Sequence, residues 1–219
     1  MKMSQNKKIL CIGAHPDDIE LNCSGILLGL PFRSINITVT LGEKVGVMYG
    51  KKTGGISEST IKSIRKKEFF NAAKMLNAKA RILNLEDGNI NKTDLKKKIK
   101  KIIKEENIIL LITHFWDSSH DDHKIVAEVI RDLNLKIPVL YWIDYSCLHR
   151  NPKIKINIRK YWKLKCKVLE NYLSQIEFSE FKKILSGQSS SKKECFFIFE
   201  KDIPQINFLK DYLKIKNVS

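Results

Sequence analysis

The sequence predicts an α/β fold: a Rossmann-like, doubly wound, mostly parallel sheet with helices on both faces. Apolar segments rich in β-branched residues alternate with amphipathic helical segments along most of the chain. The apolar segments are continuously hydrophobic, as strands are when helices cover both faces of a parallel sheet. Right-handed crossovers between such strands give a doubly wound layer. A length of 219 residues suits one domain, and we expect a single domain over 1–219.

Each strand is expected at a short apolar run, and each helix where apolar residues recur at helical spacing. The expected strands are 7–13, 35–41, 80–84, 108–113 and 138–143. The expected helices are 18–31, 57–77, 93–106, 121–134 and 160–174. Beyond residue 150 the pattern loosens: we expect a loop at 149–160, a flexible connector at 186–193 and a late edge strand at 194–200.

Half of the ten glycines fall within residues 41–55. Backbone with so many glycines is conformationally permissive, and loops at sheet ends often carry function. We therefore expect this segment to form a mobile rim over a cleft.

The net charge of +16 is typical of a nucleic-acid-binding protein, but the kind of basic residue argues against that class. Only six of the 40 basic residues are arginine, which is the better reader of phosphates and bases. The lysine-rich segment 94–107 has apolar residues at helical spacing, so its lysines form a solvated helix face. We expect no specific nucleic-acid partner, and leave open a peripheral attraction to anionic surfaces.

Five scattered cysteines form no CxxC pair, which disfavours a disulfide framework and favours a reducing compartment. The apolar runs are far shorter than the roughly 20 residues of a membrane-spanning helix. The first residues lack the long apolar region of a signal peptide. We therefore expect a cytoplasmic protein without a transmembrane segment; the sequence does not indicate its oligomeric state.

Two stretches rich in histidine and aspartate follow predicted strands: GAHPDDIELNCSG at 12–24 and THFWDSSHDDHKIV at 113–126. In open α/β sheets, ligands bind beyond the carboxyl ends of the strands, so both stretches should meet at one edge. A simpler alternative is that Asp17 only caps a helix, and that HDDH is only a solvated helix start. His114 and His149 are expected to be ordinary residues.

Imidazole and carboxylate groups suit zinc and its neighbours in the first transition row. His15 and Asp18 can converge on one ion, with His120 or His123 as a third ligand. Three protein ligands leave a position open for water, as hydrolytic zinc sites require. Asp17 is then a spare carboxylate that could act as a general base.

Five segments resemble the PIG-L/LmbE-like superfamily of zinc-dependent N-acetylglucosaminyl deacetylases. AHPDDIELNCSG is similar to the family's AHPDD-x-E opening, and HDDH to its H-x-D-H motif. The weaker matches are IRKKEFFNAAKMLN at 64–77, LNLEDGNI at 83–90 and KCKVLENYLSQ at 165–175. The resemblance implies that His15, Asp18 and His123 bind Zn²⁺ or another divalent transition metal.

The same resemblance implies the roles of further residues. Asp17 would be the general base, and His120, oriented by Asp122, would stabilise or protonate the tetrahedral intermediate. Arg65 would contact substrate hydroxyls or an anionic aglycone, and Glu20 would support the site without touching the metal. The family usually has Asp and Pro where this chain has Ser118 and Asp121, respectively, which puts the local shape of the second loop in doubt.

The implied function is hydrolytic removal of the N-acetyl group from an N-acetylated, GlcNAc-type amino sugar in a glycoside, glycolipid or glycan. A catalytically inactive sugar-binding or scaffold protein on the same fold is the main alternative. A nucleotide-binding protein is disfavoured, because GAHPDD puts carboxylates where a GxGxxG loop would offer backbone N–H groups to a pyrophosphate. The sequence identifies neither the sugar nor its aglycone.

Overall fold

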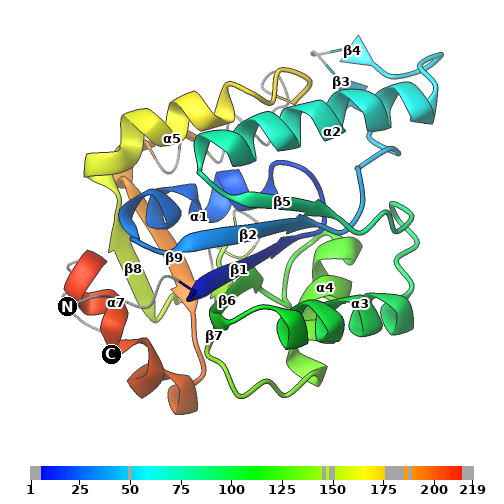
Figure 1. Cartoon of the computed structure of the whole chain (residues 1–219). Helices are drawn as coiled ribbons and strands as arrows, with labels where there is room; N and C mark the ends of the chain where they lie inside the picture. Colours follow the sequence, from blue (N-terminus) through cyan, green and yellow to red (C-terminus); the bar gives the residue numbers. More distant parts are fainter. Residues whose placement is uncertain are drawn as a thin grey trace.

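The computed structural model describes residues 6–48, 51–144, 147, 151–175, 185–186 and 189–213. Its main feature is a seven-stranded sheet flanked by helices (Figure 1). The strands of this sheet are β1 Lys8–Gly13, β2 Arg33–Thr38, β5 Lys79–Ile82, β6 Ile108–His114, β7 Val139–Trp142, β8 Ile154–Asn157 and β9 Lys193–Phe197. Their order is β5-β2-β1-β6-β7-β9-β8.

The sheet is mostly parallel, as expected. Strands β5, β2, β1, β6 and β7 run parallel, and β9 runs antiparallel to both of its neighbours. Two short strands, β3 Val47–Met48 and β4 Lys51–Lys52, form a separate hairpin. This hairpin lies in the glycine-rich segment 41–55, whose mobility stays a prediction.

Helices cover both faces of the sheet (Figure 1). They are α1 Asp18–Gly29, α2 Glu58–Met75, α3 Lys92–Glu105, α4 Asp121–Asp132, α5 Trp162–Leu169 and α7 Asn207–Leu213. Two short 3-10 helices span Arg159–Tyr161 and Glu200–Ile206. Helices α1, α2, α5 and α7 share one apolar core with the sheet, and α3 and α4 share the other.

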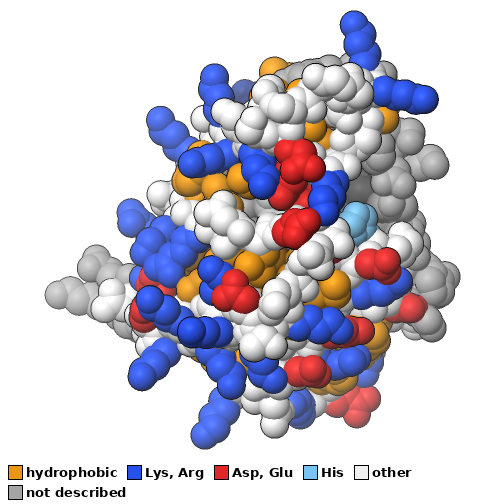
Figure 2. Space-filling model, turned by 90° about the vertical axis from the view of Figure 1, so that its right-hand side faces the viewer, with side chains coloured by type: hydrophobic (Ala, Val, Ile, Leu, Met, Phe, Trp, Pro, Cys, Tyr) orange, Lys and Arg blue, Asp and Glu red, His pale blue; other side chains and the backbone are white. Residues whose placement is uncertain are grey.

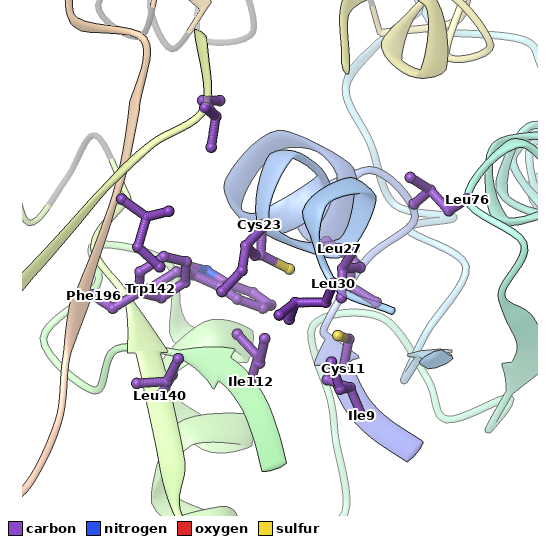
Figure 3. Packing of buried hydrophobic residues seen from close by; sticks show 14 of the residues in the cluster. Ile9, Cys11, Cys23, Leu27, Leu30, Leu76, Ile112, Leu140, Trp142 and Phe196 are labelled. Carbon is purple, nitrogen blue, oxygen red and sulfur yellow. The ribbon is translucent and has the colours of Figure 1, made fainter. Parts of the chain in front are cut away.

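Strand β1 supplies both cores because successive side chains of a strand point to opposite faces. Ile9 and Cys11 pack under α1, where Cys23 and Leu27 meet them (Figure 3). The alternate residues of β1, Leu10 and Ile12, belong to the apolar core under α3 and α4. Burial on both faces explains why the sequence of this strand is continuously apolar. The same packing holds the end of β1 in the middle of the sheet.

Two expectations for the C-terminal third are wrong. Residues 149–160 are not simply a loop, because β8 forms within them. The late strand β9 is confirmed, but it is not at the edge: it lies between β7 and β8. The alternation of buried and exposed residues in β8 is the pattern of a half-buried edge strand.

The expected helix at 160–174 is also shorter in the structure, where α5 ends at Leu169. Residues 187 and 188 of the expected connector at 186–193 lie outside the described part of the chain.

Candidate metal centre

A cavity of about 390 Å³ lies at the carboxyl edge of the parallel strands. It is lined by residues that follow β1, β2, β5, β6 and β7, including in that order His15, Gly42, Asp87, His120 and Asp144. All four described histidines belong to groups that could hold a metal ion. The histidine visible in Figure 2 therefore marks this site, with acidic side chains beside it and Lys and Arg side chains around them.

The loop between β1 and α1 holds a strained backbone. Asp17 has φ 99°, a left-handed conformation that non-glycine residues rarely adopt. It occupies the N-cap position of α1, yet its side chain makes no capping hydrogen bond. The alternative that Asp17 serves only as a helix cap is therefore wrong. Strain of this kind is typical of functional sites.

Gly13 lets this loop close tightly against the start of α1. A Cβ atom at Gly13 would lie 2.8 Å from the Cβ of Asp18. The backbone N–H of His15 donates to Oδ2 of Asp18 over 2.7 Å. The loop thus brings the His15 ring and the Asp18 carboxylate to the same end of the cavity.

The three predicted ligands converge. His15 Nδ1 lies 3.3 Å from His123 Nε2, and His123 Nε2 lies 3.4 Å from Asp18 Oδ1. The third pair, His15 Nδ1 and Asp18 Oδ2, is 3.7 Å apart. Ligands about 2.0–2.1 Å from a tetrahedral ion would be roughly 3.3 Å from one another. The spacing fits a single first-row ion.

Hydrogen bonds on the opposite ring nitrogen orient His15. Its Nε2 lies 3.0 Å from Asp87 Oδ1 and 3.3 Å from Asp122 Oδ2. In the neutral ring that binds a metal, these contacts would place the proton on Nε2 and leave Nδ1 to face His123 and Asp18. Burial alone would lower the pKa of His15, but the bonds to Asp122 and Asp87 and the charge of Asp18 raise it to about 10.

His123 is held in the same way. Its Nδ1 lies 3.2 Å from Ser118 Oγ and 3.6 Å from Asp144 Oδ2, and the Ser118 hydroxyl donates to Asp144 over 3.2 Å. Both Ser118 and Asp144 are buried. Carboxylates behind metal-binding histidines are the usual outer partners that fix tautomer and ring orientation.

The two adjacent aspartates differ in acidity. Burial raises the pKa of Asp17 to about 7; Arg65, with Nη2 3.5 Å from Asp17 Oδ2, lowers it, and the charge of Asp18 raises it. Burial also tends to raise the pKa of Asp18, but His123 and His114 hold the pKa of that carboxyl well below its usual range. One carboxyl is therefore ready to exchange a proton near neutral pH, while its neighbour stays ionised.

His120 also lines the cavity, at the N-cap of α4. Its Nδ1 accepts the backbone N–H of Asp122 over 3.3 Å, which leaves Nε2 to carry the ring proton. Burial, then the neighbouring His15 and His123, lower its pKa. The carboxylate of Asp122 instead lies against His15 and accepts the N–H of Gly88 over 2.9 Å. The structure thus shows the Asp122 backbone, rather than its carboxylate, as the group that orients His120.

Arg65 and Glu20 are both buried beside the site. Arg65 donates to the carbonyl of Pro16 over 2.7 Å, and its Nε has no partner among the described residues. A Cβ atom at Gly42, which has φ 63°, would lie 2.9 Å from the guanidinium. Glu20 accepts the hydroxyl of Tyr172 over 2.8 Å.

The expectation that His114 is an ordinary residue is wrong. Its Nε2 lies 3.1 Å from Asp18 Oδ2, and its ring stacks on His123 with 3.9 Å between centroids. Burial, and then His123, lower the pKa of His114 to about 4. His149 lies outside the described residues. Asp87 and Asp144 were also missed, although each follows a strand at the same sheet edge as the two histidine-rich loops.

An α/β sheet with a histidine and aspartate cluster at its carboxyl edge defines a class of metal-binding enzymes that includes hydrolases. The sequence matches the PIG-L family, described as GlcNAc-PI de-N-acetylase, over residues 10–134. The chain belongs to this family.

Individual proteins agree with this assignment. The chain is 26% identical over 190 residues to a probable N-acetyl-alpha-D-glucosaminyl L-malate deacetylase 2 of Bacillus anthracis, with 79% of this chain and 83% of that protein covered. It resembles the structure of an N,N'-diacetylchitobiose deacetylase from Pyrococcus horikoshii with a TM-score of 0.74 at 20% identity, covering 93% and 86% of the two chains.

The fold by itself does not specify the reaction. A 4-carboxy-2-hydroxymuconate hydratase from Pseudomonas putida has a similar structure, with a TM-score of 0.73 at 14% identity, covering 88% of this chain and 95% of the hydratase. Among the described residues, no helix is long and apolar enough to cross a membrane.

Proposed function

We propose that the protein is a zinc-dependent deacetylase that removes the N-acetyl group from a GlcNAc-type amino sugar. The observation that carries the proposal is the convergence of His15 Nδ1, His123 Nε2 and the Asp18 carboxylate, with carboxylates behind both rings. A buried donor set of two imidazoles and one carboxylate suits a catalytic zinc site. When bound, the ion would polarise the acetamide carbonyl and lower the pKa of a water molecule toward ~7.

Asp17 is proposed as the general base. Its pKa of about 7 allows the carboxylate to take a proton at neutral pH, and it lines the cavity next to the ligand Asp18. It would accept the proton of the water that attacks the acetamide carbon. Arg65 would hold the Asp17 carboxylate in place through its contact at 3.5 Å.

His120 is proposed to act on the opposite side of the acetamide. With Nδ1 occupied by the Asp122 backbone, its Nε2–H is the free donor, and the ring lines the cavity. This N–H would stabilise the developing oxyanion, and the proton that Asp17 took from the water would pass to the departing amine. Bond cleavage releases acetate and the amino sugar.

The substrate class is supported by the relatives, whose names describe enzymes acting on N-acetylated sugars. The cavity of about 390 Å³ is within the range of small-ligand pockets. Arg65 lines the cavity and is proposed to contact substrate hydroxyls or an anionic aglycone, with Asp17 and Pro16 as its present partners. We also propose a single domain and a cytoplasmic location.

Acetate release from a set of N-acetylated sugars, measured with zinc-loaded protein, tests the proposal. The metal content of the same samples is measured in parallel. Acetate release that disappears on chelation and returns with zinc would support a metal-dependent deacetylase. Stoichiometric zinc without acetate release from any N-acetyl sugar would favour the inactive sugar-binding or scaffold alternative.

A further inference from the structure

His114 sits behind the proposed metal ligands, at the end of β6. Its side chain is 0% exposed. Its Nε2 lies 3.1 Å from Asp18 Oδ2, one face of its ring stacks on His123 at 3.9 Å and 24°, and Trp142 meets it edge-on at 4.6 Å. His114 therefore contacts two of the three proposed ligands. It lies outside the HDDH motif at 120–123.

We propose that His114 is a positioning residue that holds Asp18 and His123 in the orientation that binds metal. The inference rests on the metal centre proposed above. Asp18 Oδ2 is anchored by His114 Nε2 and by the His15 backbone N–H, which leaves Oδ1 as the oxygen nearest His123 Nε2. The stacked ring of His114 limits tilting of the His123 ring.

The geometry favours positioning over direct ligation, although Asp18, His114 and His123 are close enough to form a metal-binding group. The backbone N–H of Ala14 lies 3.0 Å from Nε2 of His114 and crowds the side of this nitrogen that a metal would need. Nε2 accepts this N–H when the ring proton is on Nδ1, and it donates to Asp18 instead when the ring proton is on Nε2. A neutral ring carries one proton. On Nε2 it forms a charge-assisted bond to Asp18, and such bonds are roughly twice as strong as neutral ones.

An ordinary core role does not explain this residue. Nδ1 of His114 is buried and has no hydrogen-bond partner among the described residues, and such an atom costs about 1–3 kcal/mol. A methionine or phenylalanine would fill the same space beneath His123 without that cost. What histidine adds here is the polar contact of Nε2 with the Asp18 carboxylate.

A matched pair of variants isolates this contact. His114→Gln and His114→Met introduce unbranched side chains of similar size, but only glutamine has an N–H that can donate to Asp18. Zinc affinity is measured for each full-length protein by competition with a chromogenic chelator. We expect His114→Met to lose on the order of 10- to 100-fold in zinc affinity, as removal of an outer partner does elsewhere. We expect His114→Gln to stay within a few-fold of the wild type.

Trp142→Phe is the packing control, because Trp142 touches the His114 ring and none of the proposed ligands in the described contacts. It should lower the unfolding temperature while leaving zinc affinity near that of the wild type. Equal zinc affinity in the wild type, His114→Gln and His114→Met would overturn the positioning role alone. Equal losses in both His114 variants would also overturn it. Failure of the wild type to bind zinc would instead overturn the metal centre itself.

Discussion

Asp17 and Asp18 show how two identical neighbouring side chains acquire different chemistry. Asp18 faces two imidazoles and stays ionised, whereas Asp17 has a single cation at 3.5 Å and a pKa near 7. The strained backbone at Asp17 turns its side chain away from the helix N-terminus that would otherwise have held it. Environments that push two pKa values apart are how active sites assign acid and base roles.

Asp17→Asn should abolish most acetate release while zinc binding is retained. The amide keeps the shape of the carboxyl group but cannot accept a proton, and positioned general bases contribute about 10²- to 10⁴-fold. Asp18→Asn is the matched control, since the same change one residue later should instead reduce zinc affinity. Turnover rates and metal content from the same samples separate the two effects. Near wild-type turnover in Asp17→Asn would exclude Asp17 as the base.

His120→Ala should slow turnover by about 10²- to 10³-fold, as the loss of one oxyanion donor does elsewhere. The metal content should not change, because His15, Asp18 and His123 remain. Steady-state rates with a zinc assay provide the measurement. If His120→Ala loses its metal while His123→Ala keeps it, the two histidines must exchange roles.

Part of the site could be predicted from local sequence, and part could not. His15, Asp17 and Asp18 lie in one short motif, and His120 and His123 in another, so spacing alone indicated them. His114, Asp87 and Asp144 depend on contacts between strands that are distant in sequence, such as the 96 residues that separate Asp18 from His114. The available signal was their position at or shortly after the carboxyl ends of parallel strands. Asp87 and Asp144 lie outside the two histidine-rich stretches to which it was applied, and His114, inside one of them, was taken for an ordinary residue.

At the level of elements, the first helix is held by a buried ion pair from the C-terminal third. Lys165 and Glu194 are both fully buried and bonded to each other. Lys165 donates to the carbonyl of Leu21 over 2.6 Å, and the Glu194 carboxylate accepts the N–H groups of Gly25 and Ile26 at 2.8 Å each. The pair thereby fixes α5 and β9 against the middle of α1, the helix that begins at Asp18.

Lys165→Met should destabilise the protein by about 3–5 kcal/mol, because it leaves the Glu194 carboxylate buried without its cation. The double variant Lys165→Met with Glu194→Gln should recover part of this loss, since no unpaired charge remains. Urea unfolding gives the free energies of both variants and of Glu194→Gln alone. Strictly additive losses would show that the two side chains do not interact.

The parallel strands were predictable because burial on both faces leaves a continuous apolar run. Strand β8 was missed because it lies at the edge, where the residues Ile154–Asn157 alternate between buried and exposed within a lysine-rich context. The inner position of β9 could not be predicted from its own sequence. It depends on β8, whose pairing joins Ile154 to Phe196 and is set by tertiary contacts.

For the whole molecule, the site is a concentration of negative charge in a protein with a net charge of +16. Asp18, Asp87, Asp122 and Asp144 all contact the site histidines. Their negative charge attracts a divalent cation to a site that exists only in the folded protein. Metal binding should therefore stabilise the folded protein as well as the reactive geometry.

Chelation should lower the unfolding temperature, and zinc should restore it. A ligand that binds only the folded state adds about 4 kcal/mol at a free concentration of 1,000 times its dissociation constant. Thermal unfolding with chelator and with added zinc provides the measurement, and Asp18→Asn is the control in which the shift should be much smaller. An unfolding temperature that does not respond to zinc in the wild type would argue against a folded-state site.

The position of β9 between β7 and β8 also governs when the enzyme can mature during synthesis. The chain leaves the ribosome N-terminus first, and the motif residues His15 and Asp18 are among the earliest to emerge. The outer edge of β7 stays unpaired, and α1 stays without Glu194, until residues 193–197 have been made. An unpaired edge is a template for association with other chains. A nascent or truncated chain that ends shortly after β7 would therefore carry every proposed metal ligand, yet be prone to aggregate.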